Sequence, residues 1–258
     1  MRINALSLTV TTVVLGIFGA FLRWVQNVNA FEEGTGLATP GALSSAAFGL
    51  FTLAAFAAMA GLVMIGFRRR RPRGAAALFR VRGPMPAVGA WLLCVVMAVC
   101  GLILMFTAGS ALFPILQRLL GAAAVVAGAC FPMLPGRVFG GLNSLARPAS
   151  VFLALFCGFW LICTYCVNAL NPVLWSFGPE TLAVAFTAMA FYFLAGCYYE
   201  RKTCRAALIV GQMAIYLDLA VLSDGLSFPQ KGMLAAAAAM LLMLEYIMLS
   251  NFRERGEE

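Results

Sequence analysis

Long apolar stretches alternate with short polar ones along almost the whole chain. Eight of these stretches are long enough to cross a bilayer, since a helical span needs about 20 mainly apolar residues. They cover residues 5–22, 42–67, 86–107, 111–134, 149–169, 181–199, 206–223 and 232–250. The connections between them contain turn-forming residues, as in Pro135-Gly136 and Asn171-Pro172. The pattern predicts an all-α polytopic membrane protein with eight transmembrane helices.

The composition agrees with this prediction. Of the 258 residues, 63% are hydrophobic and 11% are charged, whereas soluble domains are about half apolar and a quarter charged. An ordinary soluble globular protein is therefore excluded. The net charge of +8 indicates either an anionic partner or a topology signal, and the distribution of Lys and Arg distinguishes the two.

The positive charges gather on one side of the predicted membrane. If the N-terminus is cytoplasmic, 15 of the 18 Lys and Arg residues fall in cytoplasmic segments, and the exceptions are Arg23, Arg118 and Lys231. This positive-inside bias predicts a protein of the bacterial cytoplasmic membrane with both termini in the cytoplasm. We expect Arg68 to Arg82 to contact anionic lipid headgroups and not nucleic acid, because no aromatic residues are interleaved with these charges.

An internal repeat relates the two halves of the chain. Val28-Asn29-Ala30 follows the first span and recurs as Val167-Asn168-Ala169 after the fifth, and each precedes a polar loop, a proline and an Ala- and Phe-rich helix. In the same way, Phe113-Pro114 resembles Phe228-Pro229, each before an Ala-rich run. The first tripeptide also reads like a signal-peptide cleavage site, but because it recurs inside the chain we expect no cleavage.

The repeat predicts two parallel four-helix units related by an axis along the membrane normal. The first covers residues 1–134 and includes an Arg-rich cytoplasmic loop, 68–85, while the second covers residues 149–258 and ends in a short cytoplasmic tail. The interface between two such bundles is a natural place for a cavity. In the alternative interpretation, eight helices simply pack together without one.

Histidine is absent from the sequence. This excludes His-based haem ligation, His-containing metal sites and Ser-His or Cys-His nucleophiles. Cys163 and Cys166 share one helical face, so a redox pair or metal site is one interpretation, but buried cysteine usually behaves as a small apolar side chain. We therefore predict no catalytic residue, no metal and no cofactor, and an enzyme is the less favoured class.

Ionisable residues at membrane depth are costly, and this makes them the best candidates for a site. Arg118 and Asp218 lie at similar depths from the outer side but in different halves. They are expected either to form an ion pair or to line an outward-facing polar pocket, with Gln212 and Tyr216 on the helix of Asp218. Arg23 and Glu245 lie close enough to the membrane surfaces for their side chains to reach the polar interface.

The first outer loop, residues 23–41, is expected to fold as a cap over the bundle mouth. Arg23, Glu32 and Glu33 in it complete the candidate ligand-binding residues. Its pattern Phe31-Glu32-Glu33-Gly34-Thr35-Gly36-Leu37, followed by Pro40-Gly41, resembles a group of uncharacterised multi-spanning membrane proteins of anaerobic Firmicutes. That resemblance covers the first span and loop and implies no activity.

Two classes of function follow from these observations. The repeat and the opposite charges of Arg118 and Asp218 favour a small-molecule transport or ligand-binding protein with a site between the two halves. The alternative is a non-catalytic membrane anchor or assembly subunit, since the predicted spans leave no soluble domain and a protein partner or homo-oligomer would have to supply chemistry. In architecture alone the chain is similar to membrane anchors of the NrfD and DmsC type, which implies a quinol-linked redox complex.

Overall fold

The computed structural model describes residues 5–32, 37–66, 70–71, 74–81, 83–110, 112–136, 141–169 and 171–254. Eight helices in this part of the chain are long and apolar enough to cross a membrane, which confirms the eight predicted spans. They are α1 (Ala5–Asn29), α2 (Leu43–Gly66), α4 (Met85–Thr107), α5 (Pro114–Cys130), α6 (Ala146–Asn168), α7 (Leu174–Tyr198), α8 (Cys204–Val221) and α9 (Phe228–Asn251). Short 3-10 turns, Ala108–Ser110 and Phe131–Met133, follow α4 and α5.

Local sequence explains where several helices begin. Pro114 and Pro229 occupy the first turns of α5 and α9, where the missing N–H of proline costs no helical hydrogen bond. Ser227 caps α9 and forms a reciprocal capping box with Gln230. α7 begins at Leu174, well before the predicted start of its span at residue 181.

Six of the helices form a closed ring of contacts. Each helix from α4 to α9 packs against the next in the chain, and α9 packs back against α4. The hairpin of α1 and α2 lies outside this ring and packs mainly on α8. α8 and α9 are consequently the most enclosed helices, with 67% of their most apolar stretch buried, against 22% for α2.

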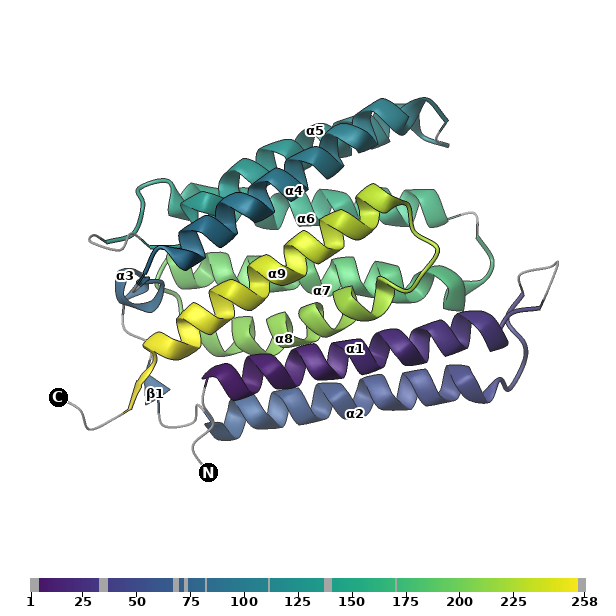
Figure 1. Cartoon of the computed structure of the whole chain (residues 1–258), viewed down its shortest axis with the longest axis horizontal. Coiled ribbons are helices and arrows are strands. Elements are labelled where there is room, and N and C mark those ends of the chain that lie inside the picture. The colour runs from purple at the N-terminus through teal and green to yellow at the C-terminus, as the bar shows by residue number, and fades with distance from the viewer. Residues whose placement is uncertain are drawn as a thin grey trace.

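This packing differs from the expected pair of four-helix bundles. Within the first half, α1 packs on α2 and α4 packs on α5, but the two hairpins lie on opposite sides of the helices of the second half (Figure 1). Small residues decide these contacts, because without a hydrophobic driving force in lipid the helices associate through close packing. Gly16 and Gly19 of α1 lie directly against Leu219 and Tyr216 of α8. The sequence repeat itself stays a prediction.

α4 and α5 approach each other at a pair of glycines. A Cβ atom added at Gly101 would lie 2.6 Å from the carbonyl oxygen of Gly121, and one added at Gly121 would lie 2.5 Å from the carbonyl oxygen of Gly101. Neither position has room for a side chain. The α4–α5 contact therefore depends on glycine at both positions.

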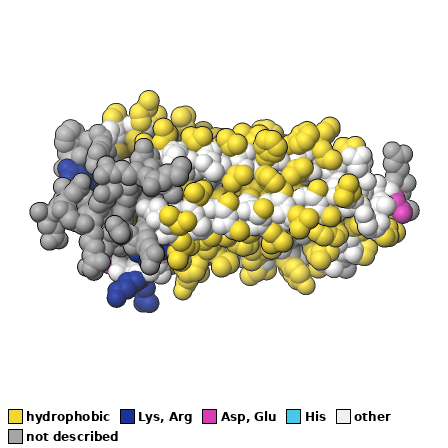
Figure 2. Space-filling model, turned by 90° about the horizontal axis from the view of Figure 1, so that it is seen from below, with side chains coloured by type: hydrophobic (Ala, Val, Ile, Leu, Met, Phe, Trp, Pro, Cys, Tyr) yellow, Lys and Arg dark blue, Asp and Glu magenta, His cyan; other side chains and the backbone are white. Residues whose placement is uncertain are grey.

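Large apolar side chains cover the outside of the molecule. Figure 2 shows the face seen from below in Figure 1, where hydrophobic side chains cover the middle, Lys and Arg gather towards one end and an acidic side chain lies at the other. Phe18 and Leu50 are among the exposed side chains, with more than half of their surface accessible. Such a band is the expected lipid-facing surface of a multi-pass membrane protein.

The end that holds the termini also carries a small docked segment. It includes the one-turn helix α3 (Ala75–Leu78) and a two-residue antiparallel ladder between β1 (Arg70–Arg71) and β2 (Arg253–Glu254) (Figure 1). Phe79 is 0% exposed and stacks on Tyr198 with the ring centroids 4.0 Å apart. Asn251 donates its side-chain amide to the carbonyl oxygens of Leu78 and Arg80.

Part of the Arg-rich loop is therefore packed on protein. The side chain of Arg80 is exposed. The side chains of the other arginines for which we expect lipid contact lie outside the described residues: Arg68, Arg69, Arg70, Arg71, Arg73 and Arg82. Their contact with anionic headgroups stays a prediction.

Candidate functional site

The end of the molecule opposite the termini, called the distal end below, is organised around Arg23. This side chain lies in α1 and is only 1% exposed. Its guanidinium binds both carboxylate oxygens of Asp224, at 2.6 and 3.1 Å. It also donates to the side-chain oxygen of Gln26 and to the carbonyl oxygens of Trp175 and Ser176. All five N–H donors of Arg23 are used.

Two expectations about Arg23 are wrong: it lies in α1 and not in the first outer loop, and its side chain is buried. We expected its side chain to reach the membrane surface, but α1 continues to Asn29 and Arg23 points into the protein.

Arg23 also provides a hydrogen-bond donor for the backbone carbonyl of Trp175 in α7. Pro179 has no N–H to donate to that carbonyl four residues earlier in α7, and the Nη1 of Arg23 donates to it at 3.0 Å instead.

The three predicted polar residues of α8 are all buried, but they face different helices. Gln212 accepts a hydrogen bond from Thr12 of α1 and donates to Glu245 of α9. Tyr216 shares a hydrogen bond of 2.9 Å with Thr52 of α2. Asp218 accepts from the hydroxyl of Thr187 in α7, with its two oxygens at 3.0 and 2.9 Å. α8 thus connects to four neighbouring helices, α1, α2, α7 and α9, through these polar contacts.

The structure does not bring Arg118 and Asp218 together. Arg118 is exposed on α5, which packs on α4 and α6, whereas Asp218 is enclosed between α8 and α7. In the described part of the chain, the ion pair of Arg23 with Asp224 is the only one. Arg23 is therefore the cation that bridges distant parts of the chain at this end.

Glu245 is also turned inward and does not reach the surface as we expected. It is buried, and its Oε2 accepts from the side-chain amide of Gln212. Its other oxygen, Oε1, is the one buried side-chain nitrogen or oxygen atom without a hydrogen-bond partner among the described residues. Gly211 makes room for this carboxyl group, because a Cβ atom there would overlap with Oε1.

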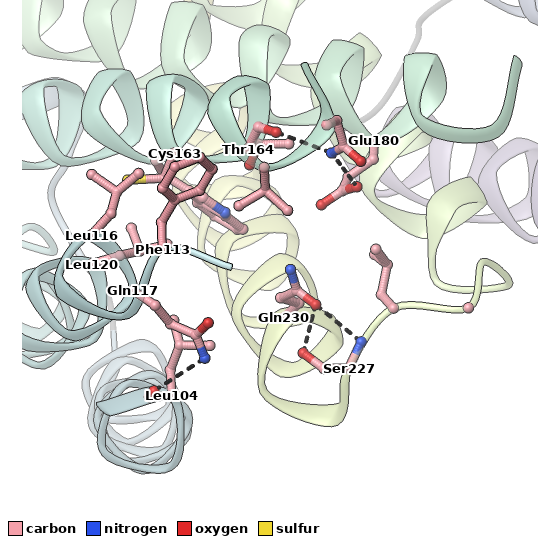
Figure 3. A pocket seen from close by; sticks show the side chains of 15 residues that line it. Leu104, Phe113, Leu116, Gln117, Leu120, Cys163, Thr164, Glu180, Ser227 and Gln230 are labelled. Atoms are coloured by element: carbon pink, nitrogen blue, oxygen red, sulfur yellow. Dashed lines mark hydrogen bonds between the residues drawn. The ribbon is translucent and has the colours of Figure 1, made fainter. Parts of the chain in front are cut away.

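A cavity of about 200 Å³ lies inside the helical ring at the distal end (Figure 3). It is partly open, and it is lined by residues of five helices (α4, α5, α6, α7 and α9) and of the connection that leads into α9. Its apolar lining includes Leu104, Phe113, Leu116, Leu120, Trp160 and Val167. Its polar lining includes Gln117, Thr164, Asn168, Glu180, Ser227 and Gln230. This distal cavity is therefore amphipathic, and both halves of the chain contribute to it.

Glu180 is the one charged side chain among the residues that line the distal cavity. It reaches in from α7 and is only 7% exposed. The side-chain amide of Asn168 lies 3.5 Å from its Oε2 and donates more closely, at 3.0 Å, to the carbonyl of Thr164. Figure 3 shows Glu180 on one side of the cavity and Gln230 and Ser227, at the start of α9, on the other.

Sequence reasoning missed Glu180. We expected the span to begin at residue 181, which placed Glu180 in an outer loop, but α7 begins at Leu174 and carries Glu180 into the protein. One feature of the sequence could have identified it. Glu180 lies directly beside the predicted start of the span, and a helix that begins a few residues earlier places this carboxylate at membrane depth.

A second, more open groove of about 330 Å³ lies next to the distal cavity. Arg23 and Asp224 line it together with Asn27 and Phe31, and Gly225 lines both the groove and the cavity. The Arg23–Asp224 ion pair therefore holds the connection that separates the two. Neither space is lined by Arg118, Gln212, Tyr216 or Asp218.

The first outer loop is folded where it is described. Phe31 and Ala38 form an antiparallel bridge, and the backbone N–H of Thr39 donates to the carbonyl of Ala30 at 2.8 Å. Glu32 is exposed beside this bridge and does not line the groove or the cavity. Glu33 lies outside the described residues, so its predicted role is untested.

The cysteines are free thiols, and Cys163 lines the distal cavity while Cys166 is half-buried. Within the described ranges, no group of three or more His, Cys, Asp or Glu side chains is placed to hold a metal ion. Comparison of the chain with known protein families, with curated proteins and with solved structures found no match. The site is therefore interpreted from its own geometry, as an amphipathic cavity in a multi-pass helical membrane protein.

Proposed function

We propose that the protein binds a small molecule in the distal cavity and transports it across the membrane. The observation that carries this proposal is Glu180, a buried carboxylate that lines a cavity between helices from both halves of the chain. Ionisable residues inside membrane-spanning segments are rare and mark substrate or ion pathways. Arg23 and Asp224 support the site by holding the connection that closes it.

The volume of the cavity limits the ligand. Sites for drug-sized ligands have volumes of about 300–1,000 Å³, whereas the distal cavity measures about 200 Å³. Its lining has an apolar wall from α4, α5 and α6 and a polar group at Glu180 and Gln230. This favours a small amphipathic molecule over a lipid or a large cofactor.

The positive-inside distribution supports a direction. Arg147, Arg201 and Arg205 lie at or beside the starts of α6 and α8, at the end that holds the termini, and the distal cavity lies at the opposite end. With the termini in the cytoplasm, the cavity is on the outer side of the bacterial cytoplasmic membrane. The site would then take its ligand from outside.

The anchor or assembly function stays an alternative prediction. A purified complex that contains redox subunits would support it. The resemblance of the first outer loop to proteins of anaerobic Firmicutes also stays a prediction. The distal cavity favours ligand binding, because an anchor needs no cavity that is lined by a buried carboxylate.

The proposed function is tested with a chemical library and two matched variants. Leu116 of α5 lines the cavity, whereas Leu119 on the same helix is 54% exposed on the outer surface. Leu116→Trp should fill the cavity, and Leu119→Trp should not. We expect compounds that raise the melting temperature of the purified wild-type protein and of Leu119→Trp, but not of Leu116→Trp.

Transport is then measured with the compounds found. Uptake into proteoliposomes that contain the wild-type protein, compared with protein-free liposomes, should exceed the amount that binding alone retains. A library without a single compound that distinguishes Leu116→Trp from Leu119→Trp would overturn the proposed site. Binding without uptake would restrict the function to a receptor or sensor.

A further inference from the structure

We infer that the ligand of the distal cavity is a small organic cation, whose ammonium group binds Glu180 and whose apolar body packs against α4, α5 and α6. This inference rests on the proposed function and names the chemical class of its ligand. It comes from the charge, the hydrogen bonds and the shape of the lining.

The charge balance of the lining is incomplete without a ligand. Glu180 is buried, yet it forms no ion pair with any described residue, because the only cation in such a pair is Arg23 and its partner is Asp224. A buried carboxylate without a cation is costly to keep charged, and a cation beside it offsets that cost. A cationic ligand would compensate that charge, whereas an anion would add a second negative charge to a lining that offers no Lys or Arg.

The hydrogen bonding of Glu180 also leaves room for a donor. Its contact with Asn168 is long, at 3.5 Å, because the Asn168 amide donates primarily to the Thr164 carbonyl at 3.0 Å. An ammonium group carries several N–H donors, and charge-assisted hydrogen bonds to a carboxylate are the strong ones. Across the cavity, the side-chain oxygen of Gln230 accepts from both the backbone N–H and the hydroxyl of Ser227, so this acceptor is already used (Figure 3).

The rest of the lining favours an organic cation over a metal ion. Trp160, Phe113 and Leu116 form an apolar and aromatic part of the same lining. Aromatic faces attract organic cations, and apolar walls pack on their carbon skeletons. A hard metal ion such as Ca²⁺ requires six or more oxygen ligands, and the lining offers a single carboxylate.

The test uses three probes with one carbon skeleton and different charges: 2-phenylethylamine, 2-phenylethanol and phenylacetate. Their dissociation constants are measured by calorimetry with the full chain in nanodiscs. We expect the amine to bind the wild-type protein at least about tenfold more tightly than the alcohol, and phenylacetate to bind weakest. Glu180→Gln should abolish the preference for the amine, and Glu32→Gln, which removes a carboxylate outside the cavity, should retain it.

A further variant separates charge from folding. Glu180→Asp keeps the carboxylate and should retain part of the preference for the amine, even if Glu180→Gln lowers the yield of folded protein. The inference would be overturned by an alcohol that binds as tightly as the amine, or by a preference for the amine that survives Glu180→Gln.

These results are distinguishable from a failure of the proposed function. Neutral or anionic library compounds that bind the wild-type protein but not Leu116→Trp would overturn the ligand class and leave the binding site in place. A protein that binds neither the probes nor any library compound would overturn both.

Discussion

Arg23 and Asp224 lie 201 residues apart in the sequence and form a bidentate, buried ion pair at the distal end of the molecule. The pair joins α1 to the connection between α8 and α9, and this connection forms one wall of the distal cavity. Arg23 also donates to the carbonyl of Trp175 in α7, for which Pro179 supplies no helical N–H. One side chain thus connects three segments around the site.

Removing either member of this pair should destabilise the protein strongly. Arg23→Met or Asp224→Leu leaves a buried charge without a partner, and the expected cost is about 3–5 kcal/mol of unfolding free energy. Their combination should cost less than the sum of the two, because no unpaired charge remains. The measurement is unfolding by SDS in mixed micelles. Arg118→Met removes an exposed arginine and should change little; equal effects of Arg118→Met and Arg23→Met would contradict the prediction.

Phe79 should be essential for docking the segment of α3 at the other end. Phe79→Ala removes the stacked contact with Tyr198 from a fully buried site, and we expect a loss of about 3–5 kcal/mol. Phe106→Ala is the matched control, since Phe106 is 86% exposed on α4. Thermal unfolding of both variants in detergent checks this expectation. A Phe79→Ala protein as stable as Phe106→Ala would show that the segment is not docked in solution.

The close contact of α4 and α5 predicts an unusual sensitivity to a single methyl group. Gly121→Ala would place a Cβ atom 2.5 Å from the carbonyl oxygen of Gly101, so the helices would have to separate. Such overpacking costs about 1–3 kcal/mol. Gly158→Ala, where a Cβ atom meets nothing within 4 Å, should be neutral or slightly stabilising. Gly121→Ala should therefore lower the melting temperature by several degrees, whereas Gly158→Ala should leave it unchanged or raise it slightly.

Two adjacent threonines of α1 should behave differently. Thr12 is buried and donates to Gln212 of α8, whereas Thr11 is half-buried and donates only to a carbonyl of its own helix. Thr12→Val should cost about 0.6–2 kcal/mol, the usual range for a hydrogen bond between membrane helices. Thr11→Val should have almost no effect. Chemical denaturation of both variants is the comparison, and an equal response would exclude Thr12 from a role in joining α1 to α8.

Fusion proteins test the predicted orientation. Green fluorescent protein at the C-terminus should fluoresce, because this end is predicted to be cytoplasmic. Alkaline phosphatase fused after Gly225, in the connection between α8 and α9, should be active because that connection is predicted to lie outside. The opposite pair of results would invert the topology and place the distal cavity on the cytoplasmic side.

Some of the site was within reach of the sequence. The mostly apolar span α8 contains three candidate polar residues, Gln212, Tyr216 and Asp218, and all three are buried. This was predictable, because polar side chains within a span rarely face lipid. Their partners were not predictable, because hydropathy does not say which neighbouring helix a face meets. The same gap explains why Arg118 and Asp218 looked like a pair: they share a predicted depth, but α5 and α8 are on different sides of the ring.

The sequence by itself determined the class of protein and its eight spans, because a bilayer requires long apolar helices and the connections between them must be polar. Only the tertiary structure decided that six helices form a ring, that α1 and α2 lie outside it, and that Glu180 faces a cavity. The physical reason is that lipid solvates every apolar helix face about equally well. The arrangement therefore depends on local close packing, such as Gly101 against Gly121, and on buried polar pairs, such as Arg23 with Asp224, whose members lie far apart along the chain.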